Sequence, residues 1–348
     1  MVVELASVLA GPFVGRFFRE HGARIIKIEN PNSGGDVTRT WRNGNENSSG
    51  LSAYYVSVNQ GKDVTFLDLK NQVDHIKLLE LLTTADILLT NFRYGEDEKF
   101  QLKLNDLKER FPKLIIGQID GFGADNPRAA YDIVLQAETG YLSMTGSENH
   151  PAKLPVAFID ILAGHQLKTG ILMAMLNKQT TGLGCIVRVS LKDAAIATLM
   201  NQASNYLMSD LIPSAIGTLH PNIAPYGEYC VCSDGKSIVL AIGNNKQFEA
   251  LLNILDLKEL QNDIRFLENP DRVKNRAVLN ILLNEAFGKM PMDFWMRKLI
   301  LDGVPAGAIR SINEVLDDPS VAYLIEQSVL ENNGQKISSV VTSAFRFE

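Results

Sequence analysis

A single carboxylate, Asp160, lies within an apolar run that reads PVAFIDILAG over residues 155–164. An unpaired ionised carboxylate is costly in an apolar interior, so such a group shifts its pKa, finds partners or stays in contact with solvent. A carboxylate that is kept ionised and is aimed at a ligand can act as a covalent nucleophile. The small residue Gly164, one helical turn further along, would leave room beside it.

The elements expected around Asp160 also allow a purely structural role. Residues 155–159 read as a strand, and residues 162–176 keep apolar residues at helical spacing, which predicts Asp160 at or next to a helix N-cap. A capping carboxylate is worth roughly 1 kcal/mol. Periodicity alone favours this capping role. Alternatively, the helix N-terminus keeps Asp160 ionised at neutral pH while the strand end directs it toward a ligand.

Four short segments are predicted to follow strands of a parallel sheet, and open parallel sheets bind ligands outside the carboxyl ends of their strands. Together they would offer backbone N–H groups, helix N-termini and the cations Lys70, Arg93 and Lys99 to a phosphate-bearing nucleotide. The first of these turns lacks GxGxxG, because the next glycine after Gly11 is Gly15, so a standard dinucleotide site is disfavoured. The four segments are residues 10–12, 67–70, 91–93 and 120–123.

Strand and helix patterns alternate along the first two hundred residues. This alternation is typical of an α/β fold with a doubly wound parallel sheet. The expected strands are residues 2–5, 24–28, 63–69, 86–90, 114–119 and 185–189, the expected helices are 12–20, 73–84, 104–110 and 191–208, and residues 34–50 are expected to form a long loop.

The pattern changes near residue 210, and 348 residues exceed the size at which a single hydrophobic core usually stops growing. A hairpin is expected at residues 226–242 around Ser233-Asp234-Gly235, followed by helices at 246–255, 271–287 and 292–301. We therefore predict a large domain at residues 1–210 and a smaller α+β domain at 211–312. Residues 313–348 are predicted to return toward the large domain.

The composition excludes several classes of function. A net charge of -6, from 34 basic and 40 acidic residues, gives no electrostatic footprint for nucleic acid. No apolar run has the length of a membrane span and no signal peptide is recognisable, so we expect a cytoplasmic protein without a membrane partner. The cysteines Cys185, Cys230 and Cys232 lack the spacing of a metal site, and Cys230 and Cys232 are expected on one face of a strand.

Seven motifs occur in the same order as in a known family and cover most of the chain. They are LASVLAGPFVGRFFREHGARIIKIE, GGDVTRTW, NQGKDVTFLDLK, ADILLTNFRYG, YDIVLQAETG, PVAFIDILAGHQLKTGILMAML and DGVPAGAIRSINEVLDDPSV. With these motifs the sequence resembles the class III CoA-transferases, the CaiB/BaiF family that includes formyl-CoA transferase. The resemblance implies a Rossmann-like large domain and a small domain in an interlocked homodimer.

The resemblance also implies a reaction, in which CoA moves from an acyl-CoA donor to a free small carboxylic acid without a tightly bound cofactor. Asp160 matches the family's nucleophile. Its carboxylate would attack the donor thioester to give a mixed anhydride and CoA thiolate, and the thiolate would then attack the enzyme acyl group to leave an aspartyl-CoA thioester. The acceptor carboxylate would reverse these steps, and water must be excluded while the intermediates persist.

The family's CoA contacts can be carried over by position. The adenine and ribose would be held by residues 67–70 and 91–93, and the pantetheine arm would run past Tyr131 toward Asp160. The phosphates would be bound by Lys70, Arg93, Lys99 and Arg128. Trp41 matches an aromatic residue near the acyl pocket, or else covers the core. Leu9 stands where an oxalate-handling relative has glutamine, which argues against oxalate as the acceptor. The implied CoA-binding residues are Ala10, Leu67, Asp68, Leu69, Lys70, Asn91, Phe92, Arg93, Lys99, Arg128 and Tyr131.

Three other functions are compatible with such a sequence. An α-methylacyl-CoA racemase on the same scaffold uses a histidine immediately before the aspartate of the YD motif, where this chain has Tyr131. His165, inside the helix after Asp160, is expected to be packed or at the surface. A nucleotide-dependent oxidoreductase is weakened by the missing glycine fingerprint. A CoA-binding protein without activity would require an unreactive Asp160.

Overall fold

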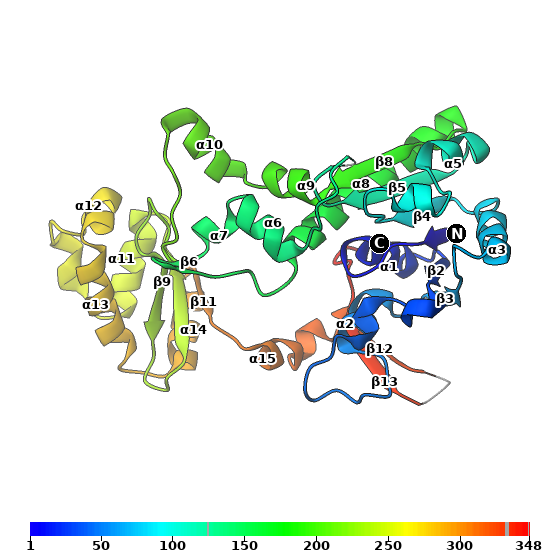
Figure 1. The fold of residues 1–348 in the computed structure, drawn as a ribbon. Helices are drawn as coiled ribbons and strands as arrows, with labels where there is room; N and C mark the ends of the chain where they lie inside the picture. The colour runs from blue at the N-terminus through cyan, green and yellow to red at the C-terminus, as the bar shows by residue number, and fades with distance from the viewer. Residues whose placement is uncertain (124, 331–333, 347) are drawn as a thin grey trace. The chain divides into compact units, whose positions relative to one another are not determined.

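The computed structural model describes residues 1–123, 125–330, 334–346 and 348 (Figure 1). The chain divides into two compact units. Unit 1 comprises residues 1–141, 153–212 and 320–348, and unit 2 comprises residues 142–152 and 213–319. Of the segment expected at 313–348, residues 331–333 and 347 lie outside the described residues. None of the helices in the described part of the chain combines the length and apolarity that a membrane-spanning segment needs.

Unit 1 is built on a six-stranded sheet with the order β3-β2-β1-β4-β5-β8, in which every neighbouring pair is parallel. The expected α/β fold with a parallel sheet is therefore confirmed. The strand order reverses between β1 and β4, and this switch point is where such sheets bind ligands. The strands are β1 (Val2–Glu4), β2 (Ile25–Glu29), β3 (Asp63–Phe66), β4 (Ile87–Thr90), β5 (Ile115–Asp120) and β8 (Ile186–Ser190).

Helices cover both faces of this sheet, which explains why its strands are apolar on both sides. Successive residues of β1 point to opposite faces, so Val2 packs into one core cluster and Val3 into another. The first cluster includes residues of α1 (Ala10–Glu20), α8 (Phe158–Thr181) and α9 (Leu191–Ala197). The second includes residues of α3 (Gln72–Leu82) and α5 (Leu104–Arg110).

The expected helix at 191–208 is wrong, because the segment forms two helices, α9 and α10 (Met200–Ser209). The hydroxyl of Thr198 donates to the carbonyls of Ala194 and Ala195, and it also hydrogen-bonds to the hydroxyl of Tyr141 at 2.8 Å. Side chains that bond to the backbone in this way compete with helix continuation. Tertiary contacts therefore interrupt a segment whose apolar spacing alone reads as one helix.

The remaining elements of unit 1 surround the sheet, and the C-terminal hairpin packs on α2 (Figure 1). Arg16 of α1 is fully buried and donates to Ser339 of that hairpin at 2.8 Å. These elements are η1 (Pro31–Ser33), η2 (Val37–Thr40), α2 (Ala53–Asn59), α4 (Glu96–Lys99), α6 (Asp132–Glu138), β12 (Ile325–Val329) and β13 (Lys336–Val340).

Unit 2 contains a three-stranded antiparallel sheet with the order β11-β10-β9. The expected hairpin is confirmed, and Cys230 and Cys232 are both buried on one face of it. The expected single helix at 271–287 is wrong, because the segment is interrupted at Asn275, between a helix that ends at Lys274 and one that begins at Arg276. The Asn275 side chain donates to the carbonyls of Arg265 and Asp271. The elements are α7 (Tyr141–Met144), β6 (Gly146–Ser147), β7 (His150–Pro151), β9 (Tyr226–Val231), β10 (Ser237–Ala241), α11 (Asn245–Ile254), η3 (Lys258–Asn262), α12 (Asn269–Lys274), α13 (Arg276–Phe287), α14 (Met292–Leu301), β11 (Ala306–Ala308), α15 (Ile312–Leu316) and η4 (Pro319–Leu324), of which α7 and η4 lie at the borders with unit 1.

The segment that leads to Asp160 differs from its sequence-based expectation in two respects. Residues 155–159 are not a strand, because α8 already begins at Phe158. Asp160 is therefore not at the N-cap. That position belongs to Ala157, which makes no side-chain capping bond, and Asp160 is the third residue of the helix.

Candidate active site

A cavity of about 930 Å³ lies at the carboxyl ends of the central strands of unit 1. Its walls include residues 5–10 after β1, residues 91–98 after β4 and residues 118–121 at the end of β5, together with Asp160. Asn91 joins the first two walls, because its side chain accepts the Ser7 N–H at 3.0 Å and donates to the Ser7 carbonyl at 2.8 Å. The cavity therefore occupies the switch point of the sheet.

Asp160 is 9% exposed and lines this cavity. Burial, and after it the nearby carboxylate of Asp132, raise the pKa of Asp160 to about 7. Within the described residues the Asp160 carboxylate makes no hydrogen bond or ion pair. The helix N-terminus was expected to keep Asp160 ionised at neutral pH, but desolvation and a like charge outweigh the helix dipole and raise its pKa. The group titrates near neutrality instead.

Asp132, the first residue of α6, supplies the cap that α8 lacks within its own sequence. Its Oδ1 accepts the backbone N–H of Ile159 at 2.8 Å, and its Oδ2 accepts a hydrogen bond from Gln136 at 2.6 Å. The carboxylate thus satisfies one of the N–H groups that have no partner within a helix. It also holds the turn that carries Asp160.

The sequence suggested that Gly164 leaves open space beside Asp160. In the structure this space is filled by α1. A Cβ atom at Gly164 would lie 2.7 Å from Cδ1 of Phe13 and 3.1 Å from the carbonyl oxygen of Ala10. The absence of a side chain therefore lets α8 approach the first turn of α1. This close packing brings the Asp160 turn beside Leu9 and Ala10, which line the same cavity.

The structure brings most of the sequence-predicted site residues together. Leu67 and Phe92 are largely buried, at 4% and 8% exposure, and Arg93 and Tyr131 are exposed. The predicted residues that line the cavity are Leu9, Ala10, Trp41, Leu67, Leu69, Asn91, Phe92, Arg93, Arg128, Tyr131 and Asp160. Asp68, Lys70 and Lys99 do not line it.

Asp68 instead organises its own turn. Its carboxylate accepts the Lys70 N–H at 3.0 Å and a hydrogen bond from the Asn32 side chain at 2.8 Å. These bonds shape the loop after β3, whose residues Leu67 and Leu69 do line the cavity. Asp68 therefore stabilises the loop that carries Leu67 and Leu69 without lining the cavity itself.

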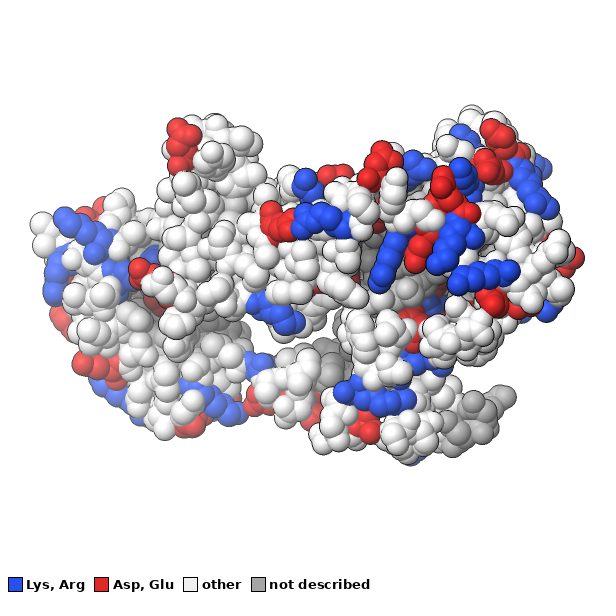
Figure 2. Space-filling model, in the orientation of Figure 1, with Lys and Arg blue, Asp and Glu red and all other residues white. Residues whose placement is uncertain are grey.

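Among the residues that the structure describes, three arginines line the cavity: Arg93, Arg128 and Arg188 of β8, of which Arg188 was not predicted. Arg128 forms an ion pair with Glu138 and stacks 4.2 Å from the ring centroid of Phe122. On the face drawn in Figure 2, basic and acidic side chains are interspersed over unit 1. Attraction for an anionic ligand is therefore local to these arginines.

Tyr54 is a residue that sequence reasoning missed. Burial, then the charges of Asp160, Asp132 and Asp36, raise the pKa of Tyr54 to about 12, so its ring lies within electrostatic reach of Asp160. Its ring meets that of Trp41 edge-on at 5.1 Å. No signal in AYYVSVN separates Tyr54 from Tyr55, which instead donates to Glu29 at 2.6 Å.

The chain matches known proteins over nearly its whole length. The sequence model of the family described as CoA-transferase family III matches residues 1–347. Succinate–glutarate CoA-transferase of Agrobacterium fabrum (strain C58) is 36% identical over 330 residues, which are 92% of this chain and 81% of that protein. Acetyl-CoA:oxalate CoA-transferase of Acetobacter aceti is 33% identical over 327 residues, 92% of this chain and 82% of that protein. Among solved structures, a CaiB/BaiF family protein from Brucella suis superposes with a TM-score of 0.88 at 36% identity, over 99% of this chain and 91% of that one.

Proposed function

The chain belongs to CoA-transferase family III, and from this premise we propose that it moves CoA from an acyl-CoA donor to a free carboxylic acid through a covalent intermediate on Asp160. One observation carries the proposal. The Asp160 carboxylate lines the cavity at the switch point without a hydrogen-bonding partner among the described residues, and its pKa is raised to about 7. A carboxylate in that state is more nucleophilic when ionised than one held by hydrogen bonds.

The reaction follows from one carboxylate acting twice. An Asp160 oxygen attacks the donor thioester carbon, the C–S bond breaks, and a mixed anhydride and CoA thiolate form. The thiolate attacks the Asp160 carbonyl carbon, which releases the donor acid as its carboxylate and leaves an aspartyl-CoA thioester. The acceptor carboxylate then displaces CoA thiolate to form a second anhydride, and thiolate attack on the acceptor carbonyl releases the new acyl-CoA and free Asp160.

Each reaction step conserves an activated acyl group. This series of steps is productive only where water is kept from Asp160, because water would hydrolyse the intermediates. Its 9% exposure and the aromatic pair Trp41 and Tyr54 support this requirement. In the proposed complex the acyl group lies beside that pair.

The loops at 67–69 and 91–93 hold the nucleotide of CoA in this proposal, with Arg93 and Arg128 on its phosphates. Both arginines line the cavity, which supports their assignment. Lys70 and Lys99 remain assigned by resemblance alone. The pantetheine arm runs past Tyr131 toward Asp160.

The relatives reported above act, by their names, on succinate, glutarate and oxalate. Leu9 lines the cavity and places an apolar side chain where resemblance to an oxalate-handling enzyme would require glutamine. We therefore take succinyl-CoA and glutarate as the first donor and acceptor to test.

A homodimer is part of the proposal, and α10 supports it. This helix carries no charged residue, and Figure 2 shows its surface as almost entirely uncharged. Met200, Leu207 and Met208 are 71%, 79% and 87% exposed. Exposed apolar surface of this kind marks an interface. Light scattering after gel filtration should give twice the chain mass of 38.4 kDa, and a mass of one chain would contradict the dimer.

Trapping the intermediate tests the activity. The protein is incubated with succinyl-CoA, quenched with borohydride or hydroxylamine, digested and mapped by mass spectrometry. We expect modification at Asp160 that is absent from Asp160→Ala and retained in Asp120→Asn, a second cavity carboxylate. No adduct, together with exchange of the α-proton of a 2-methylacyl-CoA into solvent, would overturn the proposal in favour of a racemase.

A further inference from the structure

Val8 adopts a left-handed backbone conformation, with φ of 70°, in the loop between β1 and α1. A β-branched residue is strongly disfavoured there, because its Cβ crowds the backbone. Such strain persists only where the surrounding structure imposes it, and it is found most often at functional sites. Val8 lines the cavity next to Leu9 and Ala10.

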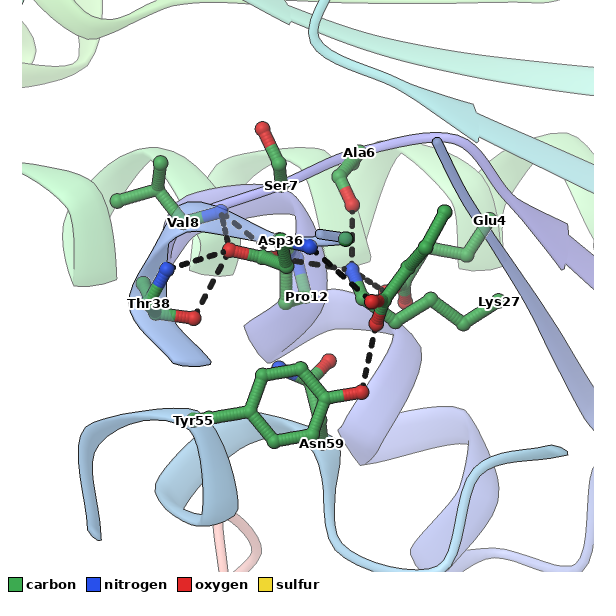
Figure 3. A network of polar contacts seen from close by, with 12 residues as sticks. Glu4, Ala6, Ser7, Val8, Pro12, Lys27, Asp36, Thr38, Tyr55 and Asn59 are labelled. Carbon is green, nitrogen blue, oxygen red and sulfur yellow. Dashed lines mark hydrogen bonds and ion pairs between the residues drawn. The ribbon is translucent and has the colours of Figure 1, made fainter. Parts of the chain in front are cut away.

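The carboxylate of Asp36 holds this turn (Figure 3). Both of its oxygens lie near the Val8 N–H, at 3.4 Å for Oδ1 and 3.2 Å for Oδ2. Oδ1 also accepts the backbone N–H and the hydroxyl of Thr38, at 3.0 and 2.8 Å. Asp36 is thereby fixed at the start of η2 while it binds the strained loop.

Two buried lysines bind the same loop on either side of Val8: Lys27, which Figure 3 shows, and Lys62. Lys27 donates to the carbonyl of Ala6 at 2.7 Å and lies 3.1 Å from both Glu4 and Asp36. Lys62 donates to the carbonyl of Pro12 at 2.9 Å and contacts both oxygens of Glu4. The loop is therefore anchored before and after the strained residue.

This network is a costly way to stabilise a fold. The side chains of Glu4, Lys27, Asp36 and Lys62 are each at most 1% exposed, and buried ion pairs often contribute no net stability relative to apolar packing. Burial lowers the pKa of Lys62 to about 7, although Glu4 opposes that shift. Replacing a buried ion pair with well-packed apolar side chains is often neutral or stabilising. It would not fix the backbone of the cavity loop.

We propose that Asp36 is a positioning residue, which holds Val8 in its left-handed conformation and thereby fixes the Leu9 and Ala10 wall of the cavity beside the Asp160 turn. The two sides are in contact, since the Ala10 carbonyl oxygen lies 3.1 Å from the position of a Cβ on Gly164. The inference rests on the proposed function of Asp160 and deepens it. A rigid wall keeps the acyl group of the donor in line with the Asp160 carboxylate.

The strain at Val8 provides the test. Glycine populates the left-handed region about as readily as any other, so a Val8→Gly variant no longer needs the clamp. Asp36→Asn weakens the clamp, because it loses the charge and one acceptor. If the role of Asp36 is positioning, adding Val8→Gly to Asp36→Asn restores much of the reaction rate that Asp36→Asn alone loses. A residue that merely stabilised the fold would not be rescued in this way.

Glu20 offers a matched control. Its side chain is 7% exposed, both oxygens of its carboxylate accept the backbone N–H of Thr342, at 2.9 and 3.0 Å, and it pairs with Arg16 at 2.8 Å. It resembles Asp36 in burial and bonding, but it does not line the cavity. Glu20→Gln therefore reports what loss of a buried backbone clamp does to the fold alone.

The experiment measures the single-turnover rate of aspartyl-CoA formation from saturating succinyl-CoA. We expect Asp36→Asn to slow it about tenfold, since the left-handed conformation disfavours a non-glycine residue by roughly 5- to 30-fold. The added Val8→Gly change is expected to restore most of the rate, and Glu20→Gln to leave it unchanged. A rate in Asp36→Asn no lower than in Glu20→Gln, or no rescue by Val8→Gly, overturns the proposal. If Asp36→Asn does not fold, Thr38→Val, which removes one hydrogen bond to Asp36, should slow the reaction in the same direction.

Hydrogen exchange separates this inference from the proposed function, because it needs no substrate. The peptide covering residues 5–13 should exchange faster in Asp36→Asn than in the wild type or Glu20→Gln. Unchanged exchange overturns the clamp. If the wild type forms no adduct with any acyl-CoA, the proposed function fails, and the exchange result alone decides whether Asp36 holds Val8.

Discussion

The carboxylate of Asp132 accepts the backbone N–H of Ile159 at 2.8 Å, one residue before Asp160. The same carboxylate raises the pKa of Asp160, second only to burial. One side chain thus fixes the helical turn that carries the proposed nucleophile and contributes, after burial, to the pH at which that nucleophile becomes ionised. These two effects can be separated, because asparagine retains the acceptor oxygen and loses the charge.

Asp132→Asn should shift the pH dependence of adduct formation to lower pH. In the wild type the rate should rise with pH through about 7, as Asp160 loses its proton. Without the charge of Asp132 the midpoint should fall, yet stay above the ordinary value of 3.8, because burial is the larger cause. Single-turnover rates from pH 4.5 to 8.5 measure the midpoint, and Asp120→Asn is the control. An unchanged midpoint in Asp132→Asn would contradict this coupling.

Asp160→Asn should stabilise the protein at alkaline pH while abolishing the adduct. The pKa of Asp160 is raised in the folded state, so between about pH 4 and 7 only the folded protein binds this proton, and wild-type stability falls as pH rises. The rise in pKa from 3.8 to about 7 corresponds to at most about 4 kcal/mol, part of which burial of the asparagine amide offsets, so we expect a gain of about 2 kcal/mol in the free energy of unfolding at pH 8.

Urea denaturation at pH 8 and pH 5 measures this gain. It should shrink as the pH falls toward 4, because the wild-type carboxyl is then protonated in the folded state and is no longer penalised. Equal effects of Asp160→Asn at both pH values would argue against a raised pKa.

The sequence was sufficient to predict the parallel sheet, because its strands are short apolar runs separated by helical periodicity. It was not sufficient to place the start of α8. The N–H of Ile159 is capped by Asp132, 27 residues earlier in the chain, so no capping residue next to the helix in sequence marks where α8 begins. Apolar residues before Asp160 therefore read as a strand.

The buried ion-pair network of Glu4, Lys27, Asp36 and Lys62 could not be predicted from the sequence either. Lys27 stands in an apolar strand, where a lone lysine reads as a side chain reaching to solvent, yet it is 1% exposed and pairs with Glu4 and Asp36. Its partners come from β1 and from the loop after β2. Only the three-dimensional pairing of these segments makes burial of the charge tolerable.

Gly164→Ala should impair the chemistry, because it separates α8 from α1. The new methyl group would meet Phe13 and the Ala10 carbonyl, which must move apart by a few tenths of an ångström or more. We expect a loss of about 1 kcal/mol in stability, since overpacking outweighs the better helix propensity of alanine. We also expect about tenfold slower adduct formation, which corresponds to about 1.4 kcal/mol.

Gly170→Ala is the matched control on the same helix. Its Cβ would lie 2.6 Å from Cγ1 of Val187, so it is also overpacked, but neither residue lines the cavity. It should change the free energy of unfolding without slowing adduct formation. Equal slowing in the two variants would show that the reaction senses general loosening of α8 and not the α1 contact.

Arg93 and Lys99 give opposite expectations for CoA binding. Resemblance assigns both to the phosphates, but only Arg93 lines the cavity. Arg93→Ala should weaken the affinity for CoA about tenfold, since a hydrogen bond to a charged group contributes about 1.5–3 kcal/mol. It should also flatten the salt dependence of binding, because a charge contact is lost.

Lys99→Ala should change the dissociation constant far less than Arg93→Ala does. Arg110→Ala is the control for loss of a surface guanidinium, because Arg110 lies outside the cavity and stacks 5.4 Å from the ring centroid of Phe111. Isothermal titration with CoA at 50 and 300 mM salt, roughly spanning the range over which screening acts, provides the comparison. A larger effect at Lys99 than at Arg93 would contradict this prediction. It would favour the phosphate contact that the resemblance assigns to Lys99, with the α4 segment moving onto the nucleotide when CoA binds.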